Sequence, residues 1–374
     1  MEHGKIIFLV DLQFGSTSKG RFAADIIRER GIKYIGTNNL PNAGHTVIIG
    51  DYKFVGKALP ASAALNRNPN TPKTIFIGPQ AAFDINRLHE EAYQCEFDKR
   101  GQIIIHPRAM VLQQKHKEIE QSTTKHIAST MQGAGAVQAE KIMRKDVKLA
   151  YNLKGDIEID NIKVSDDDLA YQMMNIMDQG DDIFIEGHQG FSLDINHGHS
   201  YPTCTSRQTI YQQMLADFGI PHKYVGDIIG VIRANHEIRV GNIIENNVEV
   251  GNSGGWYKDQ KEMTWEEYLP NKGIEEKTTV TQRVRRLATF SFYEFGRACK
   301  INNPTEIAIG FIDYMDESLE NAQGNILFTN LPDNIRAFIE RLRYICNVKY
   351  ERLGTGPNID NTIKILYKEG ENHG

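Results

Sequence analysis

The sequence predicts an α/β fold, in which one large domain is built around a mostly parallel sheet with helices on both faces. Short apolar runs typical of buried strands alternate with segments whose apolar residues recur at helical spacing. The chain has 374 residues, which is enough for one large α/β domain or for two ordinary ones. Its 40% hydrophobic and 24% charged residues are typical of a soluble globular protein.

Six apolar runs are candidate strands: Ile6–Val10, Tyr34–Gly36, Thr74–Ile77, Ile183–Ile185, Ile228–Ile232 and Ile307–Ile312. The segments predicted as helices are Phe22–Arg30, Ala81–Tyr93, Asp168–Met177, Thr209–Phe218, Val284–Ala298 and Ile335–Cys346. Because strands and helices alternate, the strands should lie parallel and the helices should cover both faces. A hairpin is predicted where Val47–Ile49 and Lys53–Val55 flank a Gly-Asp turn.

Residues 1–368 are expected to form a single folded unit, since the sequence has no internal repeat and no low-complexity segment. The stretch Asn242–Gly273 is polar, rich in Gly and Asn, and carries both tryptophans. We predict that it is a peripheral excursion from the core or a small subdomain. The last residues, Glu369–Gly374, are predicted to be disordered.

Charge and cysteine content limit the possible functions. A net charge of −5 argues against a general nucleic-acid-binding protein. The four cysteines are scattered and form no C-x-x-C pair, which predicts free thiols in a reducing cytoplasm. The N-terminal segment lacks the apolar core of a signal peptide, and no run approaches the ~18 apolar residues of a membrane helix. We therefore expect a cytoplasmic protein without a membrane partner.

A phosphate-binding loop is predicted at Gly15–Arg21, which reads Gly-Ser-Thr-Ser-Lys-Gly-Arg and follows the first strand. Glycines let backbone N–H groups approach an anion, a helix N-terminus adds partial positive charge, and Lys19 neutralises the ligand. The order G-x-x-x-K-G differs from the Walker A order, and the loop contains no carboxylate. Taken alone, the segment could also be an ordinary strand-to-helix turn.

Five further segments carry polar groups suited to anions: Asn38–Thr46, Ser129–Gly135 with Lys141 and Arg144, Glu186–Gly190 with Leu193–Arg207, Thr278–Arg286, and Leu353–Pro357. His45 could donate a hydrogen bond to a phosphoryl oxygen, and arginine binds phosphate and carboxylate bidentately. Each segment taken singly is also compatible with a turn, a helix cap or a solvated basic helix start. Three histidines and Asp194 in the third segment match no zinc spacing, so no transition-metal site is predicted.

Together and in this order, these segments resemble the adenylosuccinate synthetase family. Seven of the family's motifs have counterparts in this sequence: G-D-E-G-K-G at Gly15–Gly20, N-A-G-H-T at Asn42–Thr46, T-T-G-R-G-I-G-P at Ser129–Gly135, E-G-A-Q-G at Glu186–Gly190, T-T-G-R-x-R-R at Val280–Arg286, K-L-D at Phe311–Asp313 and S-T-G-P at Gly354–Pro357. The family's L-D-I-D-H-G-T-Y-P-x-V-T-S-S segment corresponds to Leu193–Ser206. The resemblance spans nearly the whole chain.

Two departures from the family pattern bear on the substrates. Ser16 replaces the aspartate that in the family is the general base and a magnesium ligand, and Thr17 replaces its glutamate. Phe311 replaces the lysine of the guanine-reading K-L-D motif. Serine at the first position is similar to the phage-associated branch of the family, which makes 2-aminoadenylosuccinate from dGMP and L-aspartate with an adenine nucleotide as phosphoryl donor.

The resemblance implies roles for individual residues. Ser16, Lys19, His45 and Gln189 are expected to be catalytic. The nucleotide substrate is expected to contact Ser16, Asn42, Ala43, Thr130, Arg144, Gln189 and Thr205, and L-aspartate is expected to contact Val280, Thr281, Arg283 and Arg285. The donor nucleotide is expected to contact Gly15, Thr17, Ser18, Lys19, Gly20, Gly44, Thr46, Arg285, Asp313, Gly354, Gly356 and Pro357. Mg²⁺ is the expected cofactor, held at Ser16 and the Gly44 carbonyl. Arg144 is expected to act across the interface of a homodimer.

The implied function is a ligase that joins dGMP and L-aspartate with ATP or dATP, through a 6-phosphoryl purine, for 2-aminoadenine DNA synthesis. If the protein is phage-encoded, it would act in the host cytoplasm. Two alternatives remain open: an ordinary GTP-dependent adenylosuccinate synthetase that acts on IMP, and an inactive nucleotide-binding regulator. Retention of Lys19, His45 and Gln189 argues against the regulator.

Overall fold

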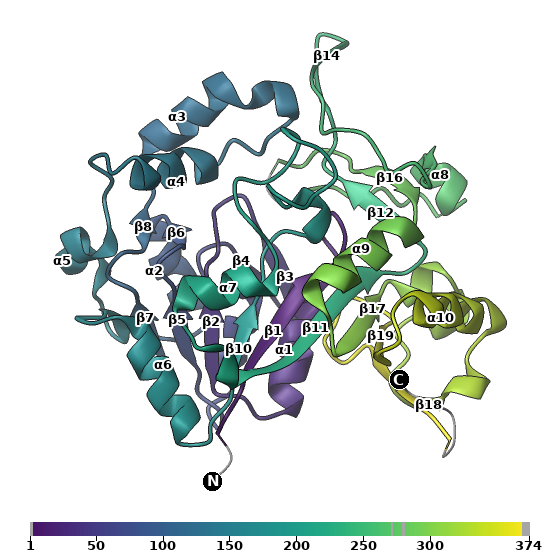
Figure 1. Ribbon diagram of the computed structural model, residues 1–374, viewed down its shortest axis with the longest axis horizontal. Helices are drawn as coiled ribbons and strands as arrows, with labels where there is room; N and C mark the ends of the chain where they lie inside the picture. The colour runs from purple at the N-terminus through teal and green to yellow at the C-terminus, as the bar shows by residue number, and fades with distance from the viewer. Residues whose placement is uncertain (1–2, 271, 279–280, 369–374) are drawn as a thin grey trace.

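The computed structural model describes residues 3–270, 272–278 and 281–368, and a large twisted sheet runs through its centre (Figure 1). Eleven strands form this sheet in the order β18-β20-β19-β17-β11-β1-β10-β2-β5-β7-β9. Neighbouring strands are parallel except for β19 and β20, which are antiparallel. The strands are β1 Ile6–Asp11, β2 Tyr34–Thr37, β5 Thr74–Ile77, β7 Gln102–Ile105, β9 Ile162–Val164, β10 Ile183–Glu186, β11 Val225–Arg233, β17 Glu306–Gly310, β18 Gly324–Leu327, β19 Lys349–Gly354 and β20 Thr362–Leu366.

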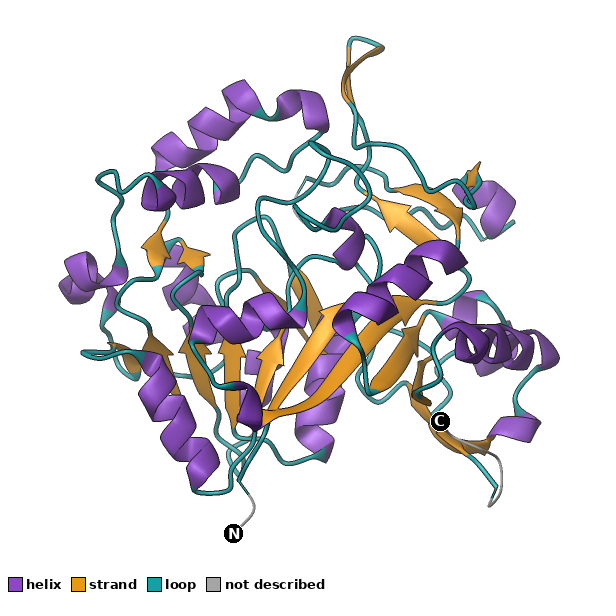
Figure 2. Cartoon of the chain, viewed as in Figure 1, coloured by secondary structure: helices purple, strands orange, loops and turns teal. Residues whose placement is uncertain are grey.

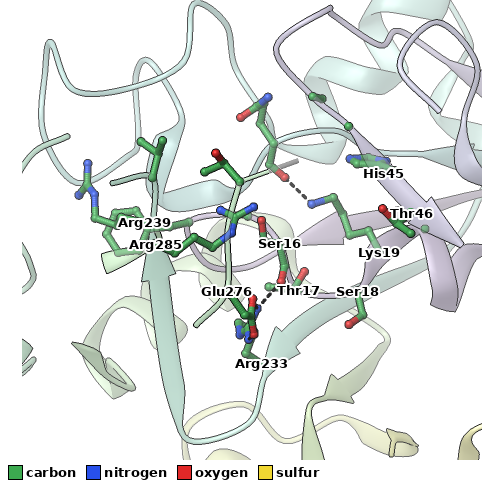
Figure 3. Close-up of a pocket in the computed structure, with 18 of the residues that line it drawn as sticks. Ser16, Thr17, Ser18, Lys19, His45, Thr46, Arg233, Arg239, Glu276 and Arg285 are labelled. Atoms are coloured by element: carbon green, nitrogen blue, oxygen red, sulfur yellow. Dashed lines mark hydrogen bonds and ion pairs between the residues drawn. The ribbon is translucent and has the colours of Figure 1, made fainter. Parts of the chain in front are cut away.

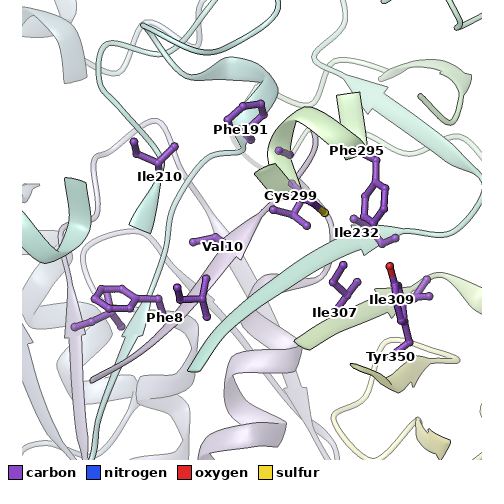
Figure 4. Packing of buried hydrophobic residues seen from close by; sticks show 14 of the residues in the cluster. Phe8, Val10, Phe191, Ile210, Ile232, Phe295, Cys299, Ile307, Ile309 and Tyr350 are labelled. Carbon is purple, nitrogen blue, oxygen red and sulfur yellow. The ribbon is translucent and has the colours of Figure 1, made fainter. Parts of the chain in front are cut away.

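Strand β1 is apolar on both sides, and its side chains alternate between two separate cores. Phe8 and Val10 lie in the core formed with α6 Leu169–Asp178, α7 Tyr211–Phe218, α9 Phe292–Asn302 and α10 Asp333–Ile345 (Figure 4). Ile7 and Leu9 lie in the core on the opposite face, with α1 Lys19–Glu29, α2 Ile85–Gln94 and α5 Lys154–Ile157. The prediction of helices on both faces is therefore confirmed.

The remaining elements lie around the central sheet and the helices that cover it (Figure 2). They are the helices α3 Gln114–Thr123, α4 Ala134–Ile142 and α8 Trp265–Tyr268, and the pairs β3 His45–Ile49 with β4 Tyr52–Gly56, β6 Ala82–Phe83 with β8 Met110–Val111, and β13 Ile243–Glu245 with β14 Val248–Gly251. A three-stranded sheet contains β12 His236–Arg239, β16 Arg286–Thr289 and β15 Glu262–Met263. The short 3₁₀ helices are η1 Ala61–Arg67, η2 Lys125–Ile127, η3 Ala150–Leu153, η4 Phe191–Leu193, η5 His222–Tyr224, η6 Ile312–Tyr314, η7 Glu317–Leu319 and η8 Phe328–Asn330.

The predicted peripheral excursion at Asn242–Gly273 is a hairpin followed by a short strand and one helical turn. The hairpin of β13 and β14 projects from the body of the molecule at the top of Figure 1. The predicted tail, 369–374, lies outside the described residues. Among the described residues, no helix is long and apolar enough to cross a membrane.

All six predicted strands and the hairpin are confirmed, whereas two predicted helices are wrong at their starts. The segment predicted as Ala81–Tyr93 begins with a short strand, and α2 starts only after Asp84, whose side chain accepts a hydrogen bond from Arg87 N. The segment predicted as Val284–Ala298 is divided, because Arg286–Thr289 pairs with β12 and only the part after Ser291 is helical. In both places, pairing with a distant strand outweighs local helical spacing.

The sheet brings the predicted motifs to one edge. Strand β1 lies between β10 and β11, so the segments that follow these three parallel strands emerge side by side. The carboxyl edge of the sheet at such a point is where open α/β sheets bind ligands.

Gly187 allows two of these segments to approach closely. A Cβ atom at this position would lie 2.3 Å from the backbone oxygen of Leu9 and 2.8 Å from Met214 Cε. The oxygen of Leu9 accepts a hydrogen bond from Gly187 N at 3.1 Å, so the two backbones cannot separate without breaking it.

We therefore expect Gly187→Ala to lower the free energy of unfolding by about 2 kcal/mol or more, measured by chemical denaturation. Gly155→Ala is the matched control, because Gly155 is an exposed helical residue whose added Cβ would have no atom within 4 Å. Equal denaturation midpoints for the two variants would contradict this close approach.

Candidate active site

A cavity of about 570 Å³ opens at the carboxyl edge of the sheet (Figure 3). Its size is that of a small-molecule site. Most of the residues predicted from the sequence line it: Gly15, Ser16, Thr17, Ser18, Lys19, Gly20, Asn42, Ala43, Gly44, His45, Thr46, Thr130, Gln189, Thr205, Arg285, Asp313, Gly354, Gly356 and Pro357. They come from loops that lie far apart in the sequence and meet in one cavity.

The loop at Gly15–Gly20 lies between β1 and α1. Gly15, Ser16 and Ser18 all have positive φ angles, of 94°, 57° and 72°. Helix α1 begins at Lys19, and its N-terminal residues Lys19 and Gly20 line the cavity. The positive end of the helix dipole and its free N–H groups are therefore available to a negatively charged ligand.

The Lys19 ammonium is fixed by two contacts within the protein. Its Nζ donates to Asp11 Oδ2 at 2.7 Å and to the backbone oxygen of Gln189 at 2.8 Å. Asp11 also accepts from Thr17 Oγ1 at 2.6 Å and from the backbone N–H of Gln13 at 2.9 Å. An ammonium has three protons, so one remains for a ligand.

His45 is held by a buried carboxylate. Its Nδ1 lies 2.9 Å from Glu186 Oε1, and the Glu186 side chain is fully buried. Glu186 also accepts hydrogen bonds from the backbone N–H groups of Ala61 and Ser62 and from Ser62 Oγ. With Nδ1 on the carboxylate, Nε2 is the ring nitrogen of His45 that remains for a ligand in the cavity.

These contacts decide the ionisation of Glu186. Burial by itself would raise the pKa of this carboxyl, but the hydrogen bond and charge of His45 and the bonds from Ser62 outweigh it, so the pKa lies below its ordinary value. Glu186 is therefore a buried carboxylate whose negative charge can balance a positive imidazole ring.

Several arginines give the cavity a positive charge, and only some of them belong to the predicted motifs. Burial lowers the pKa of Arg285 and of Arg239 to about 10, which leaves both guanidinium groups charged at neutral pH. Arg233 also lines the cavity and forms an ion pair with Glu276. The sequence analysis missed Arg233, Arg239, Glu276 and Asp11. The sequence signal for Arg233 is a charge at the end of the apolar run Ile228–Ile232.

A further part of the cavity lining, which we call the recess, consists of Arg21, Phe311, Asp313, Gly354, Gly356 and Pro357. The predicted strand Ile307–Ile312 ends earlier, at Gly310, because Phe311 adopts a left-handed conformation with φ of 61°. Burial raises the pKa of Asp313 above its ordinary range, with the charge of Arg21 acting in the opposite direction.

Three of the described site residues that were predicted, Thr281, Arg283 and Arg144, do not line the cavity. Thr281 and Arg283 lie one layer behind the cavity: Thr281 Oγ1 is 2.7 Å from Thr278 Oγ1, and Arg283 Nη2 donates to the backbone oxygens of Ala128 and Ser129. Arg144 is exposed and lies after α4, outside the cavity. Val280 lies outside the described residues.

Fold and site together define a nucleotide-binding α/β protein with a phosphate loop that differs from Walker A. The family of proteins described as adenylosuccinate synthetase matches residues 8–163 and 157–321 through its sequence model. This chain belongs to the adenylosuccinate synthetase family, as the motifs predict.

Relatives from both branches of the family are similar to the chain. The N6-succino-2-amino-2'-deoxyadenylate synthase of Vibrio phage phiVC8 is 36% identical over 82% of this chain and 85% of its own length. The corresponding synthase of Salmonella phage PMBT28 is 32% identical over 83% and 86%. The adenylosuccinate synthetase of Methanococcus vannielii is 28% identical over 96% and 98%.

Two solved structures share the fold. The succinoaminodeoxyadenylate synthetase (PurZ) of cyanophage S-2L, bound to dGMP and to dATP as an energy donor, has a TM-score of 0.82 and 26% identity, and the match covers 97% of this chain and 96% of that one. Fully ligated adenylosuccinate synthetase of Plasmodium falciparum has a TM-score of 0.79 at 20% identity, covering 96% and 100%.

The hydrogen bonds of Glu186 predict a pH-dependent contribution to stability. The folded-state pKa lies below the unfolded value of about 4.5, so the contribution is complete above pH 4.5 and is lost as pH falls through the folded pKa. We expect Glu186→Gln to be less stable than the parent by about 1–3 kcal/mol at pH 7, with a smaller difference at pH 4, in urea unfolding.

Ser62→Ala is the control for this comparison, because it removes one hydrogen bond to Glu186 and leaves the carboxylate paired with His45. Its stability loss should be smaller than that of Glu186→Gln at pH 7. A difference between parent and Glu186→Gln that stays constant with pH would contradict the depressed pKa.

Proposed function

We propose that this protein is a ligase that joins dGMP to L-aspartate with ATP or dATP as phosphoryl donor. The product is N6-succino-2-amino-2'-deoxyadenylate. The observation that carries the proposal is Ser16, a neutral hydroxyl in the cavity beside Lys19, where the family motif has a carboxylate. The phage relatives with this named activity, and the related structure with dGMP and dATP, support the assignment.

The chemistry follows from the purine. Its 6-oxygen is a poor leaving group, so transfer of a phosphoryl group to that oxygen must come before the amine of aspartate displaces phosphate. Negative charge spreads over the transferring group, and positioning and electrostatic stabilisation dominate such reactions. We assign the donor phosphates to Lys19, to the amides of the loop at Ser16–Gly20 and to the N-terminus of α1.

We assign His45 to the transferring phosphoryl group. Glu186 fixes its Nδ1, so the ring presents Nε2 in a constant orientation, and an N–H there can donate to an oxygen as charge develops. Gln189 supports the adjacent groups, because its backbone oxygen accepts from Lys19 and its left-handed φ of 58° turns the chain at the cavity. We propose that its side chain contacts the purine.

The remaining substrate contacts extend this assignment. Asn42 Nδ2 lies 3.4 Å from Thr205 Oγ1, which brings two groups proposed for dGMP together from separate loops. Ala43 and Thr130 line the same end of the cavity in our assignment. Arg285 is proposed to bind L-aspartate and donor phosphate, with Thr281, Arg283 and Val280 belonging to the same aspartate loop.

Mg²⁺ is the cofactor that we propose to accompany the donor phosphates. The cavity offers it neutral oxygens, the Ser16 hydroxyl and the Gly44 carbonyl, while the nearby carboxylate of Asp11 is already paired with Lys19. This donor set fits an ion that keeps several waters and is held largely through substrate phosphates. When bound, the ion neutralises charge on those phosphates.

We propose a homodimer in which Arg144 acts on the nucleotide of the partner subunit. Arg144 is exposed, has a left-handed φ of 56° and lies outside the cavity of its own chain. The two residues that precede it, Ile142 and Met143, have 77% and 56% of their surface exposed. A subunit interface at this position would cover these apolar side chains and bring Arg144 to a phosphate.

The substrate assignment predicts that dGMP is used at least about 10-fold better than IMP in kcat/KM, since a site built around the 2-amino group loses a hydrogen bond when it is absent.

Adenine nucleotides should be better donors than GTP, because Phe311 is apolar where the guanine-reading motif has a lysine. Phosphate release with each pair of substrates, with L-aspartate, measures both preferences. Turnover with IMP and GTP alone would indicate an ordinary adenylosuccinate synthetase, and no turnover would indicate a regulator.

The assignment of Ser16 predicts that Ser16→Asp lowers the ratio of dGMP to IMP turnover by about 10-fold or more, because a carboxylate crowds the C2 edge of the base and restores the family's N1 base. Ser16→Asn is the matched control for volume, since it is similar in size to aspartate but uncharged. An unchanged ratio in Ser16→Asp would show that Ser16 does not select the base. The selecting residues would then have to be sought among Asn42–His45 or at Gln189.

A further inference from the structure

We infer that Arg233 is a positioning residue that connects the recess at Phe311 to the backbone of Ser16, so that donor and dGMP binding are coupled. The inference rests on the proposed function, together with the expectation that the donor nucleotide contacts Asp313, Gly354, Gly356 and Pro357 in the recess and that dGMP contacts Ser16. Arg233 itself has no assigned role in that function.

Arg233 is the last residue of β11 and is only 1% exposed, yet its guanidinium borders the cavity (Figure 3). Its Nη1 donates to the backbone oxygen of Ser16 at 2.9 Å and to Glu276 Oε2 at 3.2 Å. Its Nη2 donates to the other oxygen of Glu276. One side chain therefore joins the phosphate loop to the segment that carries Arg285.

The same guanidinium covers one face of the Phe311 ring, with the central carbon 3.5 Å from the ring centroid. Phe311 lines the recess together with Asp313, so a base that displaces this ring also displaces Arg233. Cation–π contacts of this kind are strongest where the cation is desolvated, and Arg233 is almost fully buried.

His236 holds the Nε end of the Arg233 guanidinium in place. Arg233 Nε donates to His236 Nε2 at 2.7 Å, which requires that nitrogen to be an acceptor. The other nitrogen, Nδ1, lies 2.7 Å from the backbone oxygen of Ala234 and donates to it. Burial and the neighbouring charge of Arg233 hold the pKa of His236 well below its ordinary value, which agrees with a neutral ring.

The hydrogen bond from Arg233 to the Ser16 carbonyl stabilises a backbone conformation that is unfavourable by itself. Ser16 has a φ of 57°, which lies in a backbone region that is unfavourable for a non-glycine residue. A charge-assisted hydrogen bond to its carbonyl offsets that cost and fixes the direction of the peptide. Because Arg233 contacts both Ser16 and Phe311, a ligand that steadies one contact favours the other, and the effect is reciprocal.

The test is the dissociation constant of dGMP, measured by calorimetry in magnesium buffer with and without adenosine 5′-(β,γ-imido)triphosphate, which cannot transfer its terminal phosphoryl group. In the parent protein we expect the analogue to tighten dGMP binding about 5-fold or more. In Arg233→Lys, which keeps the charge but loses the planar fork and the stacking area, the tightening should fall below about 2-fold.

Two further variants separate coupling from folding. Phe311→Leu removes the aromatic face but leaves the Arg233 hydrogen bond to Ser16, and it should lose the coupling as well. Arg352→Lys is the control, because Arg352 is also a buried arginine and pairs with Glu29, Glu306 and Asp25 but does not line the cavity. It should be less stable in thermal unfolding while retaining the coupling.

The outcomes distinguish this inference from the proposed function. If the parent protein does not turn over dGMP with L-aspartate and an adenine nucleotide, the proposed function is wrong. If it does, but the analogue leaves dGMP binding unchanged, or both Arg233→Lys and Phe311→Leu keep the parental coupling, then the role of Arg233 is overturned and the function stands. If Arg233→Lys does not fold, Phe311→Leu alone decides the outcome.

Discussion

The buried ion pair between Lys19 and Asp11 is the contact on which the geometry of the site depends. The two charges are 2.7 Å apart, with 3% and 0% of their side chains exposed, so neither is stable there without the other. Asp11 is the last residue of the central strand, and its carboxylate also binds Thr17 and the backbone of the loop. The strand thus fixes the shape of the loop at Gly15–Gly20 through contacts within the protein, and the same carboxylate orients Lys19.

Around this pair, the cavity carries more positive charge than its own carboxylates balance. Arg233 is paired with Glu276, but burial lowers the pKa values of Arg285 and Arg239, which means that the protein stabilises these cations less well than water does. Such a site gains stability when anions enter. Phosphates and a dicarboxylic amino acid have the chemistry that relieves this imbalance, and this links the electrostatics of the cavity to the substrates that we propose.

Much of the fold could be predicted from the sequence, because buried parallel strands are apolar on both faces and stand out as runs such as Ile6–Val10. Strands β18 and β20, near one margin of the sheet, were not predicted, since polar residues interrupt their short apolar runs and the signal is lost. Most cavity-lining residues were predicted because they belong to motifs of the family. Arg233 and Asp11 were missed because each is a single charge at the end of an apolar strand, and its importance arises only from the groups that folding brings to it.

The central position of β1 affects how the chain can fold during synthesis. Its two partners in the sheet begin at Ile183 and Val225, so β1 has no neighbour in the sheet until the chain as far as β10 has been made. Contacts of such long sequence separation make folding slow and leave apolar strands exposed for longer. The loop at Gly15–Gly20, which follows β1, can therefore reach its folded position only after β10 and β11 have been made.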